Sequence, residues 1–309
     1  MQLFIQLEDQ TRLHFLIVEN GKFIRSHTIL ITQKEVSDFF IDQDNVVYSF
    51  ADNTLFKVMD GVIPLFYDVK HISFGKQIYL ISQNFIFRKI TDSNFEKLQR
   101  VNDDIQGLIE YKNEILTWSK THFFIAGSSI VINTQISIVK VDKDDLYFLS
   151  ASGILFKFIA GVPHEIVHSN HSDITDMCLN EFLPVVALLN SKNVFIVDVS
   201  NKKIIKIIDS YGAQSIKFKN KREIYLFCPN KILEFHLGKD FCKEVLQSEN
   251  SQFFYFNLKT DIKLETDNFK EEMRSKLIEN KIENKRMIHK LMSEINELKT
   301  TIQKFKKNE

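Results

Sequence analysis

The sequence predicts an all-β fold, a seven-bladed β-propeller that is closed by a C-terminal strand and followed by an α-helix. Three observations predict it: a recurring pair of apolar residues, β-rich runs after each pair, and chain ends that complement each other. An open β-solenoid or two β-sandwiches are the alternative architectures. A solenoid needs a shorter and stricter repeat, and sandwiches need a central linker that the sequence lacks.

The apolar pairs mark the repeat. Each pair spans positions i and i+3, and successive pairs begin 31 to 40 residues apart, which is close to the length of a four-stranded blade. The runs after each pair are rich in β-branched and aromatic residues, and polar turn residues separate them, as expected of strands. The pairs are Val36/Phe39, Val69/Ile72, Ile105/Leu108, Ile136/Val139, Ile174/Met177, Ala213/Ile216 and Phe253/Phe256.

The two ends of the repeat region complete each other. Residues 1–31 contain three strand-like runs, QLFIQL, LHFLIV and KFIRSHTIL, without an opening strand before them. Residues 253–258, FFYFNL, form an opening strand with no further strands after it. We expect this strand to pair into the sheet that begins at Gln2, because closure of the ring removes exposed sheet edges. The expected propeller covers residues 1–260.

A C-terminal helix is predicted over residues 268–308, with Asp267–Asn268 as its N-cap. Apolar residues there alternate in steps of three and four, the seam of a short coiled coil. The helix either packs on the propeller or projects and pairs with a helix of a partner or a second copy. Polar positions before Ile288 favour the second arrangement. The seam consists of Ile288, Leu291, Ile295, Leu298, Ile302 and Phe305.

A small basic tip ends the predicted helix at Lys304, Lys306 and Lys307. Such a tip is a candidate contact for RNA phosphate. Cations at a helix C-terminus are also stabilised by the helix dipole and are often solvated, which is the alternative explanation.

Charge and composition limit the classes of partner and compartment. Forty basic and forty acidic residues give a net charge of zero, so no overall field attracts the chain to nucleic acid or an anionic membrane. The 3 cysteines show no CxxC spacing, which favours a reducing compartment. No apolar run is long enough for a membrane span, and the N-terminus lacks a signal-peptide pattern. We therefore expect an intracellular protein of the nucleus or cytoplasm.

Residues with catalytic or metal-binding spacing are not evident. The 9 glycines are scattered and build no phosphate-binding loop before a helix. His164, His168 and His171 are the only histidine cluster, and their spacing suits strand and turn positions better than a metal site. Acidic pairs such as Asp144–Asp145 fall in predicted turns. We therefore expect no catalytic, cofactor-binding or metal-binding residues and a protein that is not an enzyme.

One blade resembles a WD repeat. Residues 191–203, SKNVFIVDVSNKK, resemble the third strand and turn of such a repeat, with Val197–Asp198 in place of the Trp–Asp pair. Asn170–His171 stands where these repeats carry Gly–His. The resemblance implies that His171 and Asp198 are structural and belong to a hydrogen-bonded network that fixes the turns of the blade.

The region 140–290 is similar to the non-catalytic propeller subunit of eukaryotic tRNA (guanine-N7)-methyltransferase. The similarity includes LSASG, the run FLPVVALLNSKNVFIVDVSNKKIIKII and a charged C-terminal helix. In that family the propeller supports the methyltransferase subunit and helps to place tRNA. The resemblance implies a scaffold whose protein partners bind the propeller rim and the C-terminal helix, without a membrane.

The similarity has a gap in a middle blade. The family carries an Arg-Asp-Glu stretch there, whereas the corresponding strand reads WSKTHFFIAG. The subunit contacts of the family therefore do not transfer to this chain. A structural assembly component, such as a nucleoporin-like propeller with a coiled coil, is the alternative function. An enzyme that uses a central pocket is the third.

Overall fold

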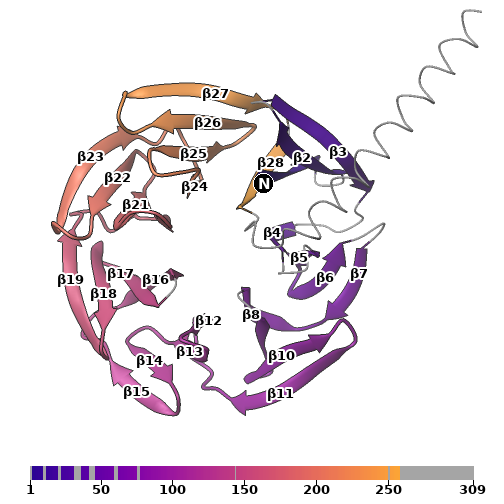
Figure 1. Ribbon diagram of the computed structural model, residues 1–309. Helices are drawn as coiled ribbons and strands as arrows, with labels where there is room; N and C mark the ends of the chain where they lie inside the picture. Colours follow the sequence, from indigo (N-terminus) through magenta and orange to yellow (C-terminus); the bar gives the residue numbers. More distant parts are fainter. Residues whose placement is uncertain are drawn as a thin grey trace, which may run out of the picture. The chain divides into compact units, whose positions relative to one another are not determined.

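The computed structural model describes residues 2–257 except for short gaps at 10–11, 20–21, 31–35, 42–45, 59–61, 75–76, 143 and 250. The described residues form one compact unit, in which seven four-stranded sheets surround a common axis as the blades of a propeller (Figure 1). This arrangement confirms the predicted seven-bladed all-β fold.

Each blade is an antiparallel sheet in which one strand lies nearest the axis and one lies at the rim (Figure 1). From axis to rim, blade 1 contains β28 (Ser251–Asn257), β1 (Gln2–Glu8), β2 (Arg12–Glu19) and β3 (Lys22–Leu30), and blade 2 contains β4 (Val36–Ile41), β5 (Val47–Ala51), β6 (Thr54–Val58) and β7 (Val62–Phe66). Blade 3 contains β8 (Val69–Phe74), β9 (Ile78–Ser82), β10 (Phe85–Thr91) and β11 (Asn94–Arg100), and blade 4 contains β12 (Gly107–Tyr111), β13 (Glu114–Trp118), β14 (His122–Ile125) and β15 (Ser128–Val131). Blade 5 contains β16 (Ile136–Asp142), β17 (Asp145–Ser150), β18 (Ile154–Ile159) and β19 (Val162–His168). Blade 6 contains β20 (Asp176–Leu179), β21 (Val185–Leu189), β22 (Asn193–Asp198) and β23 (Lys203–Asp209). Blade 7 contains β24 (Ser215–Phe218), β25 (Glu223–Cys228), β26 (Lys231–His236) and β27 (Phe241–Gln247).

The predicted apolar pairs lie where the axis-facing strands begin, and a backbone irregularity explains the spacing of three of them. Residues three apart in a regular strand point to opposite faces. The register of β4 shifts between Val36 and Asp38, so Val36 and Phe39 enter the same apolar cluster. An extra residue of this kind is a β-bulge, which reverses the alternation. Corresponding shifts occur between Val69 and His71 in β8 and between Ile136 and Ile138 in β16.

The ring closes through β28. This strand pairs antiparallel with β1, from Gln2 opposite Asn257 to Glu8 opposite Ser251. The C-terminal end of the propeller thereby supplies the axis-facing strand of the blade that the N-terminus begins (Figure 1). The predicted pairing of residues 253–258 with the N-terminal sheet is confirmed, with bounds of Ser251–Asn257.

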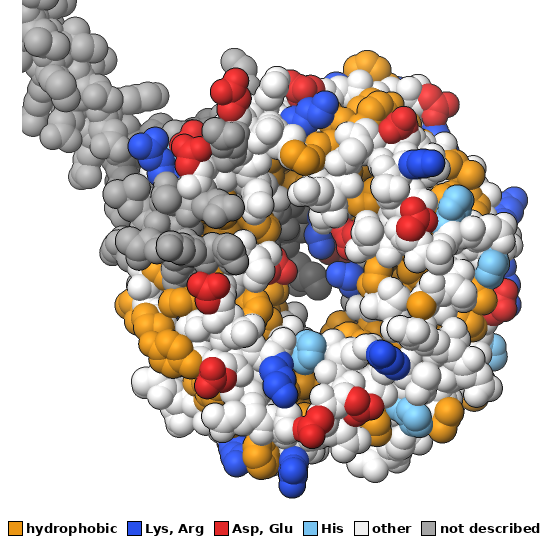
Figure 2. Space-filling view, turned by 180° about the vertical axis from the view of Figure 1, so that it is seen from behind, with side chains coloured by type: hydrophobic (Ala, Val, Ile, Leu, Met, Phe, Trp, Pro, Cys, Tyr) orange, Lys and Arg blue, Asp and Glu red, His pale blue; other side chains and the backbone are white. Residues whose placement is uncertain are grey.

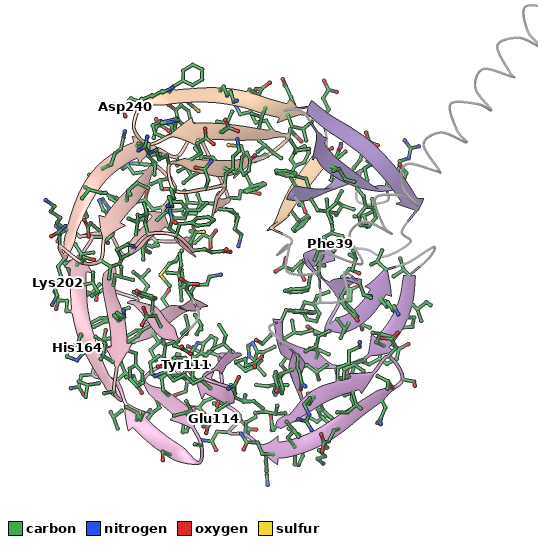
Figure 3. All side chains as sticks on the ribbon, in the orientation of Figure 1. Phe39, Tyr111, Glu114, His164, Lys202 and Asp240 are labelled. Carbon is green, nitrogen blue, oxygen red and sulfur yellow. The ribbon has the colours of Figure 1, made fainter. Side chains whose placement is uncertain are left out.

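The core consists of apolar clusters between neighbouring blades. Alternate residues of β25 illustrate this: Ile224 and Leu226 pack against blade 6, whereas Tyr225 and Phe227 pack against blade 1. A middle strand is therefore buried on both faces, which explains why EIYLFC reads as a continuous apolar run. Each such fully buried side chain contributes about 1.5–3 kcal/mol of burial free energy. Figure 3 shows side chains filling the spaces between the blades, with Phe39 on the axis-facing strand of blade 2.

None of the described residues forms a helix that is long and apolar enough to cross a membrane. The predicted helix over 268–308 lies outside the described residues.

Candidate functional site

The loop between β20 and β21 is fixed by its first residue. The side-chain Oδ1 of Asn180 accepts hydrogen bonds from the backbone N–H groups of Phe182 and Leu183, with N···O distances of 2.9 and 3.2 Å. The backbone of Asn180 also donates to the carbonyl of Val185 at 3.0 Å. Asparagine commonly stabilises turns in this way, because its short side chain reaches backbone groups two or three residues ahead.

Two large apolar side chains project from this loop. Phe182 is 53% exposed and Leu183 is 40% exposed. Pro184 follows them, and its carbonyl accepts a hydrogen bond from Val199 N–H at 2.9 Å. We call Phe182 and Leu183 the ridge. Single exposed apolar residues are ordinary, but an adjacent pair on a pinned loop is a feature of binding surfaces.

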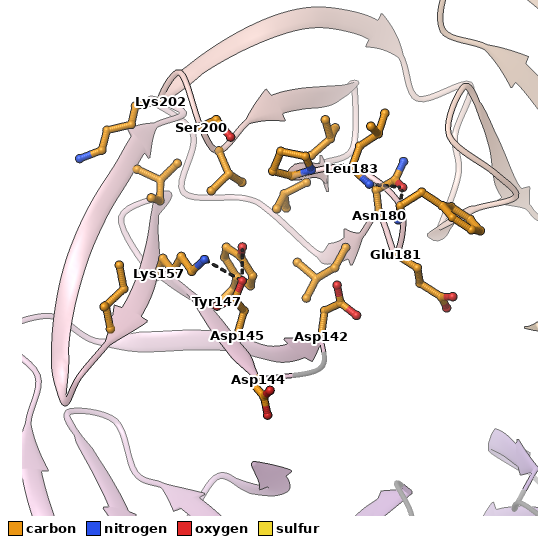
Figure 4. Close-up of a pocket in the computed structure, with 18 of the residues that line it drawn as sticks. Asp142, Asp144, Asp145, Tyr147, Lys157, Asn180, Glu181, Leu183, Ser200 and Lys202 are labelled. Atoms are coloured by element: carbon orange, nitrogen blue, oxygen red, sulfur yellow. Dashed lines mark hydrogen bonds and ion pairs between the residues drawn. The ribbon is translucent and has the colours of Figure 1, made fainter. Parts of the chain in front are cut away.

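A hollow lies on one side of the ridge, between blades 5 and 6 (Figure 4). It has a volume of about 640 Å³. Its walls come from the β16–β17 turn, the outer strands of blade 5 and the loop that carries the ridge. The carboxyl side chains in its lining are Asp142, Asp144, Asp145 and Glu181, and the lysines are Lys157 and Lys202. We call it the acidic hollow.

One of these carboxylates is neutralised within the wall. Lys157 Nζ donates to Asp145 Oδ2 at 2.6 Å and lies 5.4 Å from the ring centre of Tyr147. Burial opposes protonation of Lys157, but its hydrogen bond to Asp145 and its attraction to Tyr147 and Asp145 together outweigh burial and raise the pKa of Lys157. Burial also raises the pKa of the Tyr147 hydroxyl. Lys157, Asp145 and Tyr147 therefore form one connected part of the wall.

Two other carboxylates in the acidic hollow remain available. The ion pairs among the described residues leave Asp142 and Asp144 unmatched. Figure 4 shows both residues at the β16–β17 turn, with the Asp142 side chain on the side of the loop that carries Glu181. The hollow therefore has an excess of negative charge next to an apolar ridge.

A second hollow lies on the other side of Phe182. Its lining consists of Phe182, Asn220, Lys221, Arg222, Glu223 and His236, and its volume is about 590 Å³. The ion pairs among the described residues leave Lys221 and Arg222 unmatched, while Glu223 pairs with Lys219 at 3.2 Å. We call it the basic hollow. Phe182 thus separates two hollows of opposite charge.

The β24–β25 loop beside the basic hollow repeats the asparagine turn with one difference. Asn220 Oδ1 accepts hydrogen bonds from Arg222 and Glu223 N–H at 2.8 and 3.0 Å. Its amide Nδ2 donates to Glu223 Oε2 at 2.6 Å. Asn180 is only 3% exposed, yet its Nδ2 has no hydrogen-bond partner among the described residues. A buried unpaired donor is uncommon in folded proteins.

The central channel is a second place where charged residues gather. Asp38 of β4 and Asp176 of β20 lie on axis-facing strands, and each accepts a hydrogen bond from the next backbone N–H at 2.8 Å. Although the Asp38 side chain is accessible, protein atoms around the channel displace water and raise its pKa, against the opposing effect of Lys217 and Lys140. Figure 2 shows side chains of both signs at the wall of the central opening.

Asp176 joins blades 6 and 7. Its Oδ2 accepts hydrogen bonds from Ser215 Oγ at 2.8 Å and from Ile216 N–H at 3.0 Å. Nearby Cys178 is partly buried, and the loss of water around it raises the pKa of its thiol and disfavours the reactive thiolate. The contacts of Asp176 and Cys178 are therefore structural.

The two residues assigned by resemblance to a WD repeat lie in separate turns. Asp198 ends β22 and accepts hydrogen bonds from the N–H and the amide of Asn201 at 2.9 and 2.7 Å, which lower the pKa of Asp198. His171 lies 3.9 Å from Asp173, and its ring centre is 4.9 Å from that of Phe195. Asp198 stabilises its own turn, whereas the ring of His171 contacts Phe195 of β22, and a shared network between them stays a prediction.

The histidines of the considered metal cluster have other surroundings. His164 lies in the lining of the acidic hollow, and Figure 3 shows it at the rim of blade 5. His168 Nδ1 lies 2.5 Å from Asn170 Oδ1. Within the described part of the chain, no group of three or more His, Cys, Asp or Glu residues is placed to hold a metal ion. The coiled-coil seam from Ile288 to Phe305 and the basic tip at Lys304, Lys306 and Lys307 lie outside the described residues.

Comparisons with known proteins identify the fold. The sequence matches no family model and no curated protein. Its structure is similar to Sqt1 from Saccharomyces cerevisiae, with a TM-score of 0.56, 9% identity and coverage of 79% of this chain and 82% of the other. It is similar to apo AztD from Citrobacter koseri, with a TM-score of 0.61, 7% identity and coverage of 83% of this chain and 98% of the other. It is also similar to a functionally unknown protein from Desulfotomaculum acetoxidans, with a TM-score of 0.59, 10% identity and coverage of 81% of this chain and 98% of the other. These likenesses show the propeller fold alone.

Proposed function

We propose that this chain is a non-enzymatic scaffold subunit that holds partner proteins at the surface of its propeller. The observation that carries the proposal is the ridge, since Phe182 and Leu183 stand exposed on a loop that hydrogen bonds fix in place. Aromatic residues are enriched at the centres of protein interfaces, where they lose little conformational freedom on binding. The hollows on both sides add charged groups that select a partner.

The partner that we favour is the catalytic subunit of a tRNA (guanine-N7)-methyltransferase, with which this chain forms a complex that also places tRNA. The sequence similarity over residues 140–290 supports this proposal, and it includes the strands on both sides of the ridge. On this proposal the basic tip of the C-terminal helix contacts the RNA. The protein is then intracellular, in the nucleus or cytoplasm.

Affinity purification of the tagged full-length chain from its native cells, followed by mass spectrometry, tests the proposal. We expect a stoichiometric partner with methyltransferase activity toward tRNA. A stable complex that contains other proteins but no methyltransferase contradicts this identity while keeping the scaffold function. A chain that purifies alone under gentle conditions contradicts both.

A structural assembly component is the second candidate, and the predicted coiled-coil seam favours it. Ile295→Asp or Leu298→Asp then abolishes complex formation while the propeller stays folded, because a buried charge is not tolerated in the seam. Size-exclusion chromatography with light scattering measures this. If the oligomeric state and the partners stay the same, the seam does not mediate assembly.

A further inference from the structure

We infer that the ridge and the two hollows beside it form one site for an extended segment of a partner protein. In this site a Lys or Arg of the segment enters the acidic hollow, an apolar residue covers Phe182 and Leu183, and an Asp or Glu enters the basic hollow. The inference rests on the proposed function, since it names the chemistry of the partner that the scaffold holds.

The charges beside the ridge determine which charged residues the two ends of the segment carry. Asp142 and Asp144 lack ion-pair partners among the described residues and line the acidic hollow, so a cation that enters there gains attraction without breaking an existing pair. Lys221 and Arg222 likewise lack ion-pair partners among the described residues and line the basic hollow. The arginine fork can bind a carboxylate through two hydrogen bonds. Complementary charges at two points also fix the register of a segment.

The ridge provides the apolar centre of the site. Its exposed side chains lie between the two charged regions, because Phe182 borders both hollows. The turn around Asn180 already holds the loop in place, so little loop entropy is lost when a segment docks. An aromatic anchor surrounded by polar groups is the usual arrangement of an interface hot spot.

RNA is a less suitable occupant of this site. A base can stack on an exposed aromatic ring, but each phosphate needs a cation nearby. The carboxylates of Asp142, Asp144 and Glu181 line the side of the ridge that a strand would follow. Binding of RNA is therefore an outcome that the test must separate from binding of a peptide.

Fluorescence anisotropy of the full-length chain with labelled synthetic peptides tests the inference. The probe peptides carry Lys, Leu and Glu, separated by Gly-Ser spacers of graded length. The comparison peptides replace this set by Lys–Leu–Lys, Glu–Leu–Glu or Lys–Ser–Glu, and a labelled oligouridine represents RNA. We expect the best Lys–Leu–Glu spacing to bind about tenfold tighter than each comparison peptide. Equal binding of all peptides, or tighter binding of oligouridine, overturns the inference.

Variants locate the binding on the ridge. Phe182→Ser is expected to weaken the best peptide by about tenfold or more, while Phe241→Ser, at a similarly exposed residue on β27, leaves it unchanged. Asp144→Lys is expected to shift the preference toward Glu–Leu–Glu. If Phe182→Ser has no effect on the peptide or on the partner that co-purifies, the scaffold function stands and this site is refuted. If no partner co-purifies with the unaltered chain, the proposed function fails first.

Discussion

The ring of Phe4 meets the ring of Tyr225 edge to face, with centroids 5.3 Å apart and planes at 81°. Phe4 belongs to β1 of blade 1, and Tyr225 belongs to β25 of blade 7. The first and last blades therefore share an apolar core, which Phe253 of β28 also enters. This contact, together with the pairing of β28 and β1, makes the closure of the ring a packed interface as well as a hydrogen-bonded one.

Phe4→Ala is expected to lower the free energy of unfolding by about 3–5 kcal/mol, because it leaves a cavity in the core between blades 7 and 1. Urea unfolding followed by fluorescence measures the change. Phe241→Ala is the matched control, since that side chain is largely exposed and its loss should stay within about 0.5 kcal/mol. Equal effects of the two substitutions would show that the core between blades 7 and 1 is not packed as described.

Gly153→Ala is expected to be strongly destabilising, because a Cβ at this position would lie 1.8 Å from the carbonyl oxygen of His171. Gly161→Ala is the control for backbone conformation, since Gly161 has a similar positive φ but no atom within 4 Å of such a Cβ. The control should cost about 1 kcal/mol from its φ alone. Thermal unfolding compares the two, and a melting temperature of Gly153→Ala equal to that of the control contradicts the close approach.

Asp176→Ala is expected to destabilise the propeller by roughly 1.5–3 kcal/mol, because it removes the acceptor of hydrogen bonds from Ser215 and Ile216 across the boundary between blades 6 and 7. Asp144→Ala, at a carboxylate without a matched ion pair among the described residues, should have an effect within about 0.5 kcal/mol. Chemical denaturation measures both. A loss as small as that of Asp144→Ala would show that the link between the blades is replaced by water.

Asp38→Asn is expected to stabilise the protein at neutral pH. The channel raises the pKa of Asp38 above its usual value of 3.8, so the folded state binds the proton more tightly than the unfolded state. Stability from this group is fully present below pH 3.8 and is lost as the pH rises through the raised pKa. Asparagine keeps the acceptor for Phe39 N–H and avoids a charge that the channel deprives of water.

Melting temperatures at pH 7 and near pH 4 measure the effect of Asp38→Asn. The variant should melt higher than the unaltered chain at pH 7, and the difference should shrink toward pH 4. A variant that melts lower at pH 7 would show that attraction to Lys140 and Lys217 outweighs the cost of removing water from Asp38.

The fold was predictable because its strongest determinants are local in the sequence. The spacing of Val36 and Phe39 indicates a strand that begins with a bulge. The continuous apolar run EIYLFC indicates that β25 is buried on both faces. The unmatched strands at the two ends predicted the pairing of β28 with β1. The four-stranded unit repeats in each blade, so the period remains visible in the sequence even where individual residues differ between blades.

The candidate site was not predicted, since it depends on how separate blades approach one another. Phe182 and Leu183 precede a strand in the sequence and look like part of its apolar run, whereas the turn at Asn180 exposes them. Asp144 was assigned to a turn, which is confirmed, but its place opposite the ridge follows from the packing of blade 5 against blade 6. An asparagine followed by two large apolar residues and a proline was the available signal.

Residues 2–257 close into one ring, and the closed ring holds the ridge between its two hollows. Hydrogen–deuterium exchange of the intact chain tests this closure most directly through peptides that cover Ser251–Asn257. We expect the amides of β28 to exchange as slowly as those of β24, since both are axis-facing strands that pair with one neighbour in their blade. Exchange in β28 as fast as in the exposed loops would contradict the closure and the placement of the site.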